Sequence, residues 1–318
     1  MTEENTAGKL KYHGRLAQTW IYFKKFLRMF VYQSDWKVLP IGAIIATLVT
    51  LVTGKNMFVT MEGTNYGSFA LTCACIWNGV FNSIQVVCRE RDIVKREHRG
   101  GLHVSSYVSA HMIYQFMLCL MQTIVTLLIC WILAVKFPAE GIVTPWGIVD
   151  LGITILIVTY TADILGLMVS CLVRTSTTAM TVVPFLLIFQ LVFSGGFFDL
   201  AGPAEKVKYA TISHWGMDCM CTVGRYNTLP MTTLWKTMVR FKDVYVEDRQ
   251  PIKELVVYMK ENDLVDSFKV WSGQNSAVPS YEAIPANVWH CWGALLIMIA
   301  VFAIVAVIAL KMVDRDKR

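Results

Sequence analysis

The sequence predicts an all-α polytopic membrane protein with six transmembrane helices. Apolar residues make up 55% of the 318 residues, and charged residues only 16%. Several apolar runs approach or exceed the roughly 20 residues that a helix needs to cross a hydrocarbon core of about 30 Å. The net charge of +6 is read as a signal of topology and not of nucleic acid binding, because Lys and Arg gather at the cytoplasmic ends of spans.

Residues 1–37 form a predicted cytoplasmic N-terminus that contains an amphipathic helix. From Leu16 and Trp20 onward, apolar residues recur at steps of four and three, while Lys24 and Arg28 occupy other faces. A helix rich in aromatic residues and cations is suited to lying in the membrane interface. Packing against soluble protein is the alternative, and the position directly before a span favours the interface.

Residues 38–198 hold the first five predicted spans. The first is short and has Pro40 in its first turn, where proline is tolerated. A tight turn at Arg174 joins the fourth span to the fifth. The five spans cover about residues 38–53, 66–87, 107–135, 146–173 and 179–198.

The sixth span follows a long segment of mixed polarity, residues 199–287. Residues 288–318 contain that span and a basic tail. Lys and Arg gather before the first span, between the second and third, and in the tail, so the positive-inside rule places both termini in the cytoplasm. Residues 199–287 then form an extracellular re-entrant segment or outer lobe, in which apolar residues at helical spacing over 251–265 predict a packed helix.

The most distinctive stretch is the charged segment 89–107, RERDIVKREHRGGLHVSSY. Ile93 and Val94 fall at helical spacing among the charges, and Gly100 followed by Gly101 predicts the end of a helix. A charged helix beneath the membrane offers a docking surface to a cytoplasmic partner. Alternatively, its cations only fix the topology, since the positive-inside bias explains them without a partner.

Motifs for catalysis are absent from the sequence. It contains no GxxxxGK[ST], HExxH, CxxC or GxSxG pattern. His98 and His103 have no carboxylate partner in view, so we expect no metal site. We therefore expect no catalytic residue and no cofactor bound by this chain. Cys219 and Cys221 are interpreted either as two free thiols or as partners in an intersubunit disulfide.

Asp163 lies well inside a predicted span, where an ionisable residue is a functional candidate by default. Hydroxyl groups at Thr159, Tyr160 and Thr161 make a hydrogen-bonded structural role an equal alternative. At the outer end of the fifth span, FSGGFF at 193–198 predicts a break in the helix, because paired glycines bend easily or permit close backbone contact. Ordinary interfacial aromatic residues at a helix end are the alternative there.

Taken together, these features resemble the membrane domain of the G subfamily (White-type) of ABC exporters, which are ABC-2 type permeases. The order of an amphipathic helix, two spans, a charged helix, three spans, FSGGFF, a long outer segment and a last span covers residues 16–313. The residues of the charged segment that carry the likeness are Glu90, Arg91, Arg96, Glu97, Gly100, Ser105, Ser106 and Tyr107.

The resemblance implies specific roles. The N-terminal helix would be the connecting helix, and residues 89–101 the coupling helix that touches an ATP-binding domain. Two membrane domains would form a dimer around a cavity lined by the second and fifth spans. The residues that couple the permease to the ATPase would be Glu90, Arg91, Arg96, Glu97 and Arg99. The residues that line the substrate cavity would be Ala74, Cys75, Asn78, Ile188, Leu191 and Val192. Phe197 and Phe198 would form a hydrophobic plug.

The implied function is that of a permease subunit of an ATP-driven exporter. It would move an amphipathic, lipid, peptide or glycan-like substrate by alternating access. ATP and Mg²⁺ would be handled by a separate ATPase subunit, and a second permease copy would complete a homodimer or heterodimer in a bacterial inner membrane. The family's ATP-binding domain is not within this sequence, so we expect either a separate ATPase polypeptide or a longer protein of which this chain is one half. Asn78 stands where an aromatic residue can occur. The alternative is a membrane anchor or enzyme subunit that binds through its extracellular lobe.

Overall fold

Helices make up the regular structure of the chain. The structure, a computed structural model, describes residues 14–32, 36, 38–196, 202–243 and 249–312. Within those ranges no strand forms, and Glu140 pairs with Trp146 in an isolated antiparallel bridge. The predicted all-α fold is confirmed. The longer helices are α1 (Arg15–Tyr32), α2 (Val38–Thr53), α3 (Met61–Ser83), α4 (Val86–Arg99), α5 (Val104–Ile132), α6 (Gly147–Leu172), α7 (Ser176–Val192) and α13 (Pro285–Lys311), and the shorter ones are α8 (Pro203–Val207), α9 (Ile212–Val223), α10 (Thr233–Asp243), α11 (Arg249–Glu261) and α12 (Val265–Asn275).

Several of these helices can cross a membrane. Among the described residues, four stretches are both long and apolar enough: α3 continued by α4 (Met61–Arg99), α5, α6 and α13. The helices α2 and α7 are also apolar but have only 16 and 17 residues. A multi-pass membrane protein is therefore supported, and the count of six spans stays a prediction.

The second predicted span is shifted along the chain. The hydroxyl of Thr60 accepts a hydrogen bond of 3.1 Å from the N–H of Gly63, and this N-cap starts α3 at Met61 instead of residue 66. At its other end α3 stops at Ser83, and the chain resumes as α4 at Val86. The charged helix thus continues almost directly from the span before it.

Glycines end α4 as predicted. The N–H of Leu102 donates to the carbonyl of Glu97 at 3.0 Å, and the N–H of Gly101 donates to His98 at 3.1 Å. These two bonds are the Schellman pattern of a helix C-terminus. Gly101 has a φ of 103°, which residues with a side chain rarely adopt. The chain therefore turns from α4 into α5 within a few residues.

Small residues bring α3 and α6 together at the centre of the bundle. A Cβ atom at Gly79 of α3 would lie 2.3 Å from the carbonyl oxygen of Thr159, and one at Gly166 of α6 would lie 2.6 Å from the hydroxyl of Ser83. Glycine at both positions allows the two backbones to touch, as is common where helices pack in a membrane. The helix α13 packs on α6 as well.

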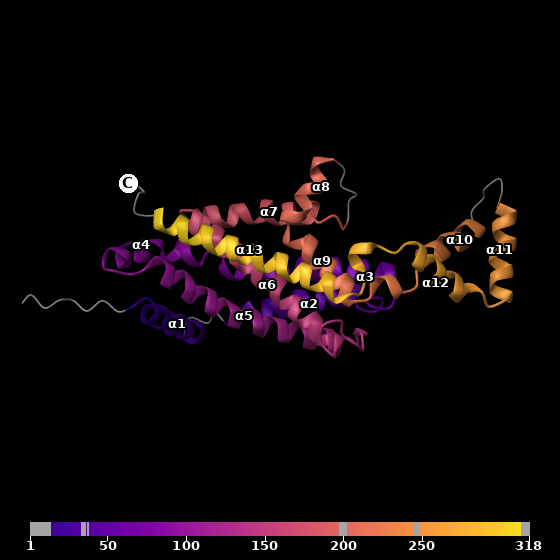
Figure 1. Cartoon of the computed structure of the whole chain (residues 1–318), viewed down its shortest axis with the longest axis horizontal. Coiled ribbons are helices and arrows are strands. Elements are labelled where there is room, and N and C mark those ends of the chain that lie inside the picture. Colours follow the sequence, from indigo (N-terminus) through magenta and orange to yellow (C-terminus); the bar gives the residue numbers. More distant parts are fainter. Residues whose placement is uncertain (1–13, 33–35, 37, 197–201, 244–248, 313–318) are drawn as a thin grey trace, which may run out of the picture.

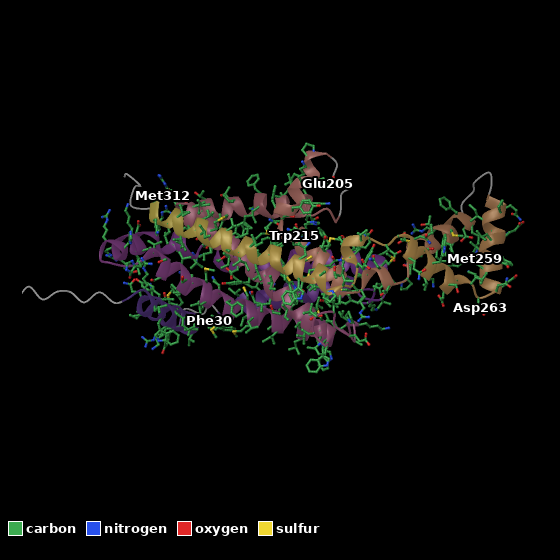
Figure 2. The ribbon with its side chains drawn as sticks, viewed as in Figure 1. Phe30, Glu205, Trp215, Met259, Asp263 and Met312 are labelled. Atoms are coloured by element: carbon green, nitrogen blue, oxygen red, sulfur yellow. The ribbon has the colours of Figure 1, made fainter. Side chains whose placement is uncertain are left out.

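The two ends of the bundle differ. Figure 1 shows α1, α4 and the C-terminal end of α13 at one end, whereas α10, α11 and α12 project from the opposite end. Figure 2 places Met312 at the first end, and Met259 and Asp263 in the projecting unit. Which end faces the cytoplasm, and the domain boundaries themselves, stay predictions.

Part of the segment 199–287 returns into the bundle. The helix α9 packs against α3, α6 and α13, and Ile212, Met217 and Met220 on it are fully buried. A Cβ atom at Gly216 would lie 2.8 Å from the Cγ2 atom of Thr72 on α3, so these two helices also touch closely. The described part of the segment therefore holds the short helix α8, the inserted helix α9 and then the projecting unit α10–α12.

Candidate functional site

Hydrogen bonds fasten α4 to the C-terminal end of α6. One guanidinium nitrogen of Arg91 donates to the carbonyl oxygens of Cys171 and Val173, at 3.1 and 2.7 Å. The hydroxyl of Ser170 accepts from the backbone N–H groups of Val87 and Cys88, at 3.0 and 3.2 Å. The last carbonyls of a helix have no partner within that helix. Arg91 therefore satisfies the end of α6 while fixing the start of α4.

Two acidic residues of α4, Glu90 and Glu97, point toward α1. The phenol of Tyr22 donates to a carboxylate oxygen of Glu97 at 2.5 Å. Glu90 lies 3.6 Å from the ammonium of Lys25 and accepts a 3.1 Å hydrogen bond from Tyr107 at the start of α5. Burial, reinforced by the bond to Glu97, raises the pKa of Tyr22 well above its usual value, so this tyrosine remains a donor. Glu90 and Glu97 thus hold α1, α4 and α5 together.

The amide of Gln18 adds a second fastening between α1 and the turn after α4. Its nitrogen donates to the carbonyl of Gly101 at 3.2 Å, and its oxygen accepts from the N–H of His103 at 2.9 Å. The hydroxyl of Ser106 donates to the carbonyl of Arg15 at 3.0 Å. The amphipathic character of α1 was predicted from its sequence. The contacts themselves, which join residues more than 80 positions apart in the chain, were not predicted.

The outward surface of α4 carries a different set of residues. Of the five predicted coupling positions, Arg96 and Arg99 are exposed, whereas Glu90, Arg91 and Glu97 are partly covered. Asp92 and Ile93 are exposed beside them. Asp92 and Ile93 could have been added to the predicted coupling residues from their spacing, because residues three and four apart share a face of a helix. We define the outward surface of α4 by Asp92, Ile93, Arg96 and Arg99, which are all exposed and open to a partner.

An apolar cavity of about 420 Å³ lies between α3 and α7. Ile188 and Leu191, both predicted cavity residues, line it from α7. On α3 the lining includes Trp77 and Phe81, whose rings stack with centroids 5.4 Å apart. Both rings are substantially exposed, as expected of a wall that faces open space or another molecule. The aromatic pair at i and i+4 could have been recognised in the sequence, but it was not among the predicted lining residues.

The predicted α3 residues lie on other faces of that helix. Ala74, Cys75 and Asn78 are all buried inside the chain's own bundle. The amide of Asn78 lies against Gly42 of α2, where an added Cβ would be 3.4 Å from its nitrogen. Val192 at the end of α7 is partly buried and does not line the cavity. The assignment of these residues to substrate binding stays a prediction.

The end of α7 shows the predicted break. The helix stops at Val192, and Gly195 follows with a φ of 73°, in the left-handed region. A Cβ atom at Gly196 would lie 2.2 Å from the sulfur of Met217, so the chain here runs directly along α9. Phe197 and Phe198, the predicted plug, lie outside the described residues.

An amide side chain joins α7 to α9. The side-chain oxygen of Gln190 accepts from the backbone N–H groups of Ile212 and Ser213, at 2.9 and 3.2 Å. The hydroxyl of Ser213 donates back to the carbonyl of Gln190 at 2.5 Å. Gln190 is almost fully buried. It therefore satisfies the first N–H groups of α9, which a helix cannot pair internally.

Asp163 is completely buried between α3, α5 and α6. One carboxylate oxygen accepts from the thiol of Cys119 at 3.3 Å, and the other has no hydrogen-bond partner among the described residues. Its backbone carbonyl accepts from Ser83 at 2.5 Å. On α3, Asn82 exchanges two amide hydrogen bonds with Gln122 of α5. Whether Asp163 serves transport or only structure stays open.

The two cysteines of α9 are buried within the bundle. Cys219 and Cys221 are both free and fully covered, and Cys219 lies 3.3 Å from the hydroxyl of Thr154. Such burial favours the interpretation as free thiols, because an intersubunit disulfide requires access from outside. Among the described residues, no group of three or more His, Cys, Asp or Glu side chains is placed to hold a metal ion.

Comparison with known proteins assigns the family. Residues 17–220, more than half of the chain, match the family described as ABC-2 type transporter. A stretch of 150 residues is 25% identical to the ABC transporter ATP-binding/permease protein Rv1747 of Mycobacterium tuberculosis. That similarity covers 46% of this chain and only 17% of the mycobacterial protein. The family match includes α4 and both helices of the apolar cavity, and the chain therefore belongs to the ABC-2 type transporter family.

Proposed function

We propose that this chain is the permease subunit of an ATP-driven ABC exporter. A separate ATPase subunit would dock on the outward surface of α4 and supply ATP and Mg²⁺. The family supports a membrane component of a transporter, and the similar mycobacterial protein is named as both ATP-binding and permease. Both termini would lie in the cytoplasm of a bacterial inner membrane, on the same side as α4.

The attachment of α4 on two sides is the observation that carries this proposal. Arg91 holds α4 to the end of α6, and Glu97 holds it to α1. The same helix follows α3 after a short interruption. A displacement of α4 by an ATPase would therefore be transmitted to α3, α6 and α1 together, because the polar contacts resist independent movement.

Alternating access would act on the cavity between α3 and α7. Its lining is predominantly apolar, with Trp77 and Phe81 on one wall and Ile188 and Leu191 on the other. A second permease copy facing this cavity would enclose a larger space suited to an amphipathic, lipid, peptide or glycan-like substrate. Nucleotide can drive such a change only through different affinities for the inward-open and outward-open states.

The test uses the full chain purified from its native membrane together with bound proteins. An ABC ATPase should copurify, identified by mass spectrometry and by ATP hydrolysis in the preparation. Reversing the charge of Arg96 and Arg99 together should reduce its recovery, whereas reversing Arg28, an exposed cation of α1, should not.

Two results would contradict the proposal. One is a stable wild-type chain that copurifies with no ATPase. The other is a chain that instead retains a partner through α10–α12, which would favour the anchoring alternative.

A further inference from the structure

A second cavity lies apart from the one between α3 and α7, in the part of the bundle next to α4. It encloses about 350 Å³ and is bounded by α1, α2, α5 and the junction of α3 with α4. Its lining mixes apolar residues with amides, a histidine and the side chains of Arg89 and Glu90. Phe81 separates the two cavities, because it contributes to both linings. The proposed transport route does not use this second cavity.

Two buried side chains in this lining have polar atoms without hydrogen-bond partners among the described residues. His111 of α5 is 2% exposed, and neither of its ring nitrogens has a partner among the described residues. Gln115, one turn further on and 1% exposed, has no partner for its side-chain oxygen. Buried polar groups in native proteins are almost always satisfied. The cavity therefore calls for an occupant that both donates and accepts hydrogen bonds.

Aromatic contacts hold His111 in this position. Its ring stacks on Phe26 of α1, with centroids 3.9 Å apart, and meets the edge of Tyr107 at 4.7 Å. A neutral imidazole offers one donor and one acceptor. An occupant with an anionic oxygen would accept from the first, and a hydroxyl on the same molecule would donate to the second or to Gln115.

The charges around the cavity favour an anion. Glu90 is already balanced, because its carboxylate lies 3.6 Å from Lys25 and accepts a hydrogen bond from Tyr107. Arg89 donates to the side-chain oxygen of Gln85, which occupies only part of the donor capacity of a guanidinium group. Among the residues that the structure describes, no acidic side chain forms an ion pair with Arg89, so the lining retains one cation open to an anion.

The position of the cavity indicates a lipid. His111 comes seven residues after Val104, the first residue of α5, which is roughly 10 Å along the helix axis. Headgroups occupy about 5 to 8 Å on each side of the hydrocarbon core. With the start of α5 at the aqueous surface, as the proposed topology has it, this level is where headgroup and acyl chain meet. Phe26 and Leu118 in the lining offer apolar contacts beyond it, and the outer faces of α2 and α5 expose many apolar side chains.

We propose that this cavity binds one anionic phospholipid with a hydroxylated headgroup, from the leaflet on the side of α4. Arg89 and the N–H of His111 bind the phosphate, and a headgroup hydroxyl donates to the oxygen of Gln115. An acyl chain lies along Phe26 and Leu118. The lipid would join α1 to the bundle on the side away from α7, and its binding requires no transport activity.

Native mass spectrometry of the purified, delipidated full chain tests this site. Phosphatidylglycerol and phosphatidylcholine with the same acyl chains are titrated separately, and inorganic phosphate is titrated as a third probe. We expect phosphatidylglycerol to bind about tenfold more tightly than phosphatidylcholine, because it alone combines net charge with hydroxyl donors. Arg89→Gln should remove this preference, whereas Arg28→Gln, which removes an exposed cation outside the cavity, should retain it.

Further variants and outcomes complete the test. Gln115→Leu should weaken phosphatidylglycerol binding without changing phosphatidylcholine binding. If this buried substitution prevents folding, Arg89→Gln still tests the lipid site, because Arg89 is exposed and its replacement does not disturb the core. Equal affinity for the two lipids would overturn the proposal, and so would equal loss of binding in the two arginine variants. Saturable binding of inorganic phosphate that displaces the lipid would assign an anion site without a lipid.

Discussion

The phenol of Tyr22 on α1 donates a 2.5 Å hydrogen bond to the carboxylate of Glu97 on α4. The two residues are 75 positions apart, and their contact closes the space between the amphipathic helix α1 and the charged helix α4. Lys25, one turn further along α1, forms a second contact between the two helices with Glu90. The charged helix is thus part of a three-helix unit with α1 and the start of α5.

Replacing Tyr22 with Phe tests this contact. The variant should lose about 1.5 kcal/mol of stability, the lower end of the range for a hydrogen bond to a charged group, because the pair is only partly buried. The pKa of Tyr22 is raised above its unfolded value, so the contribution is fully present below the unfolded pKa of about 10 and is lost as the pH rises through the higher folded value.

Thermal unfolding of the purified chain between pH 7 and 11 measures this effect. The difference in melting temperature between wild type and Tyr22→Phe should be constant near neutral pH and should shrink only at the alkaline end. Glu97→Gln in the Tyr22→Phe background should add little further loss if the two side chains act as a pair. Fully additive losses would show that the contact is not energetically coupled.

Glycine at position 79 is expected to be essential for packing. In Gly79→Ala the new methyl group would lie 2.3 Å from the carbonyl oxygen of Thr159, which forces α3 and α6 apart. We expect a loss of about 1 to 3 kcal/mol, typical of overpacking. Gly293→Ala in α13 is the matched control, since a Cβ there would meet nothing within 4 Å. Melting temperatures in detergent should fall for the first variant and stay level or rise for the second.

Local features of this molecule could be predicted from the sequence, and contacts between distant helices could not. The amphipathic pattern located α1, and the glycine pair located the end of α4, because both signals lie within a few residues. The α3 face was harder to assign, since polar and apolar residues are distributed around this helix and no single apolar stripe gives a direction. In the structure Trp77 and Phe81 face α7, while Ala74, Cys75 and Asn78 lie in the interior of the bundle.

Two cysteines on α3 distinguish these faces experimentally. Cys73 lines the cavity with α7 and is partly exposed, whereas Cys75 is 3% exposed and lies inside the bundle. In variants that retain one of the two and have the other replaced by Ser, a membrane-permeant maleimide should label Cys73 much faster than Cys75. Faster labelling of Cys75 would show that α3 is rotated and would restore the predicted cavity residues.

Gln190 is predicted to determine whether α7 and α9 move as one unit. Gln190→Leu keeps the approximate size of the side chain but leaves the N–H groups of Ile212 and Ser213 without their acceptor. Both residues are fully buried, and an unpaired buried donor costs about 1 to 3 kcal/mol. The variant should therefore unfold at a lower temperature than wild type. Hydrogen exchange measured by mass spectrometry should increase first at the start of α9.

Gln190→Glu is the informative control, because it restores an acceptor and places a negative charge at a helix N-terminus, where such a charge is stabilised. Exchange at Ile212 and Ser213 should return toward the wild-type rate in this variant, even if its melting temperature stays low from the cost of burying a charge. A leucine variant with wild-type exchange at these two residues would mean that α9 is held by its apolar contacts alone. In that case a movement of α7 during transport would not need to carry α9 with it.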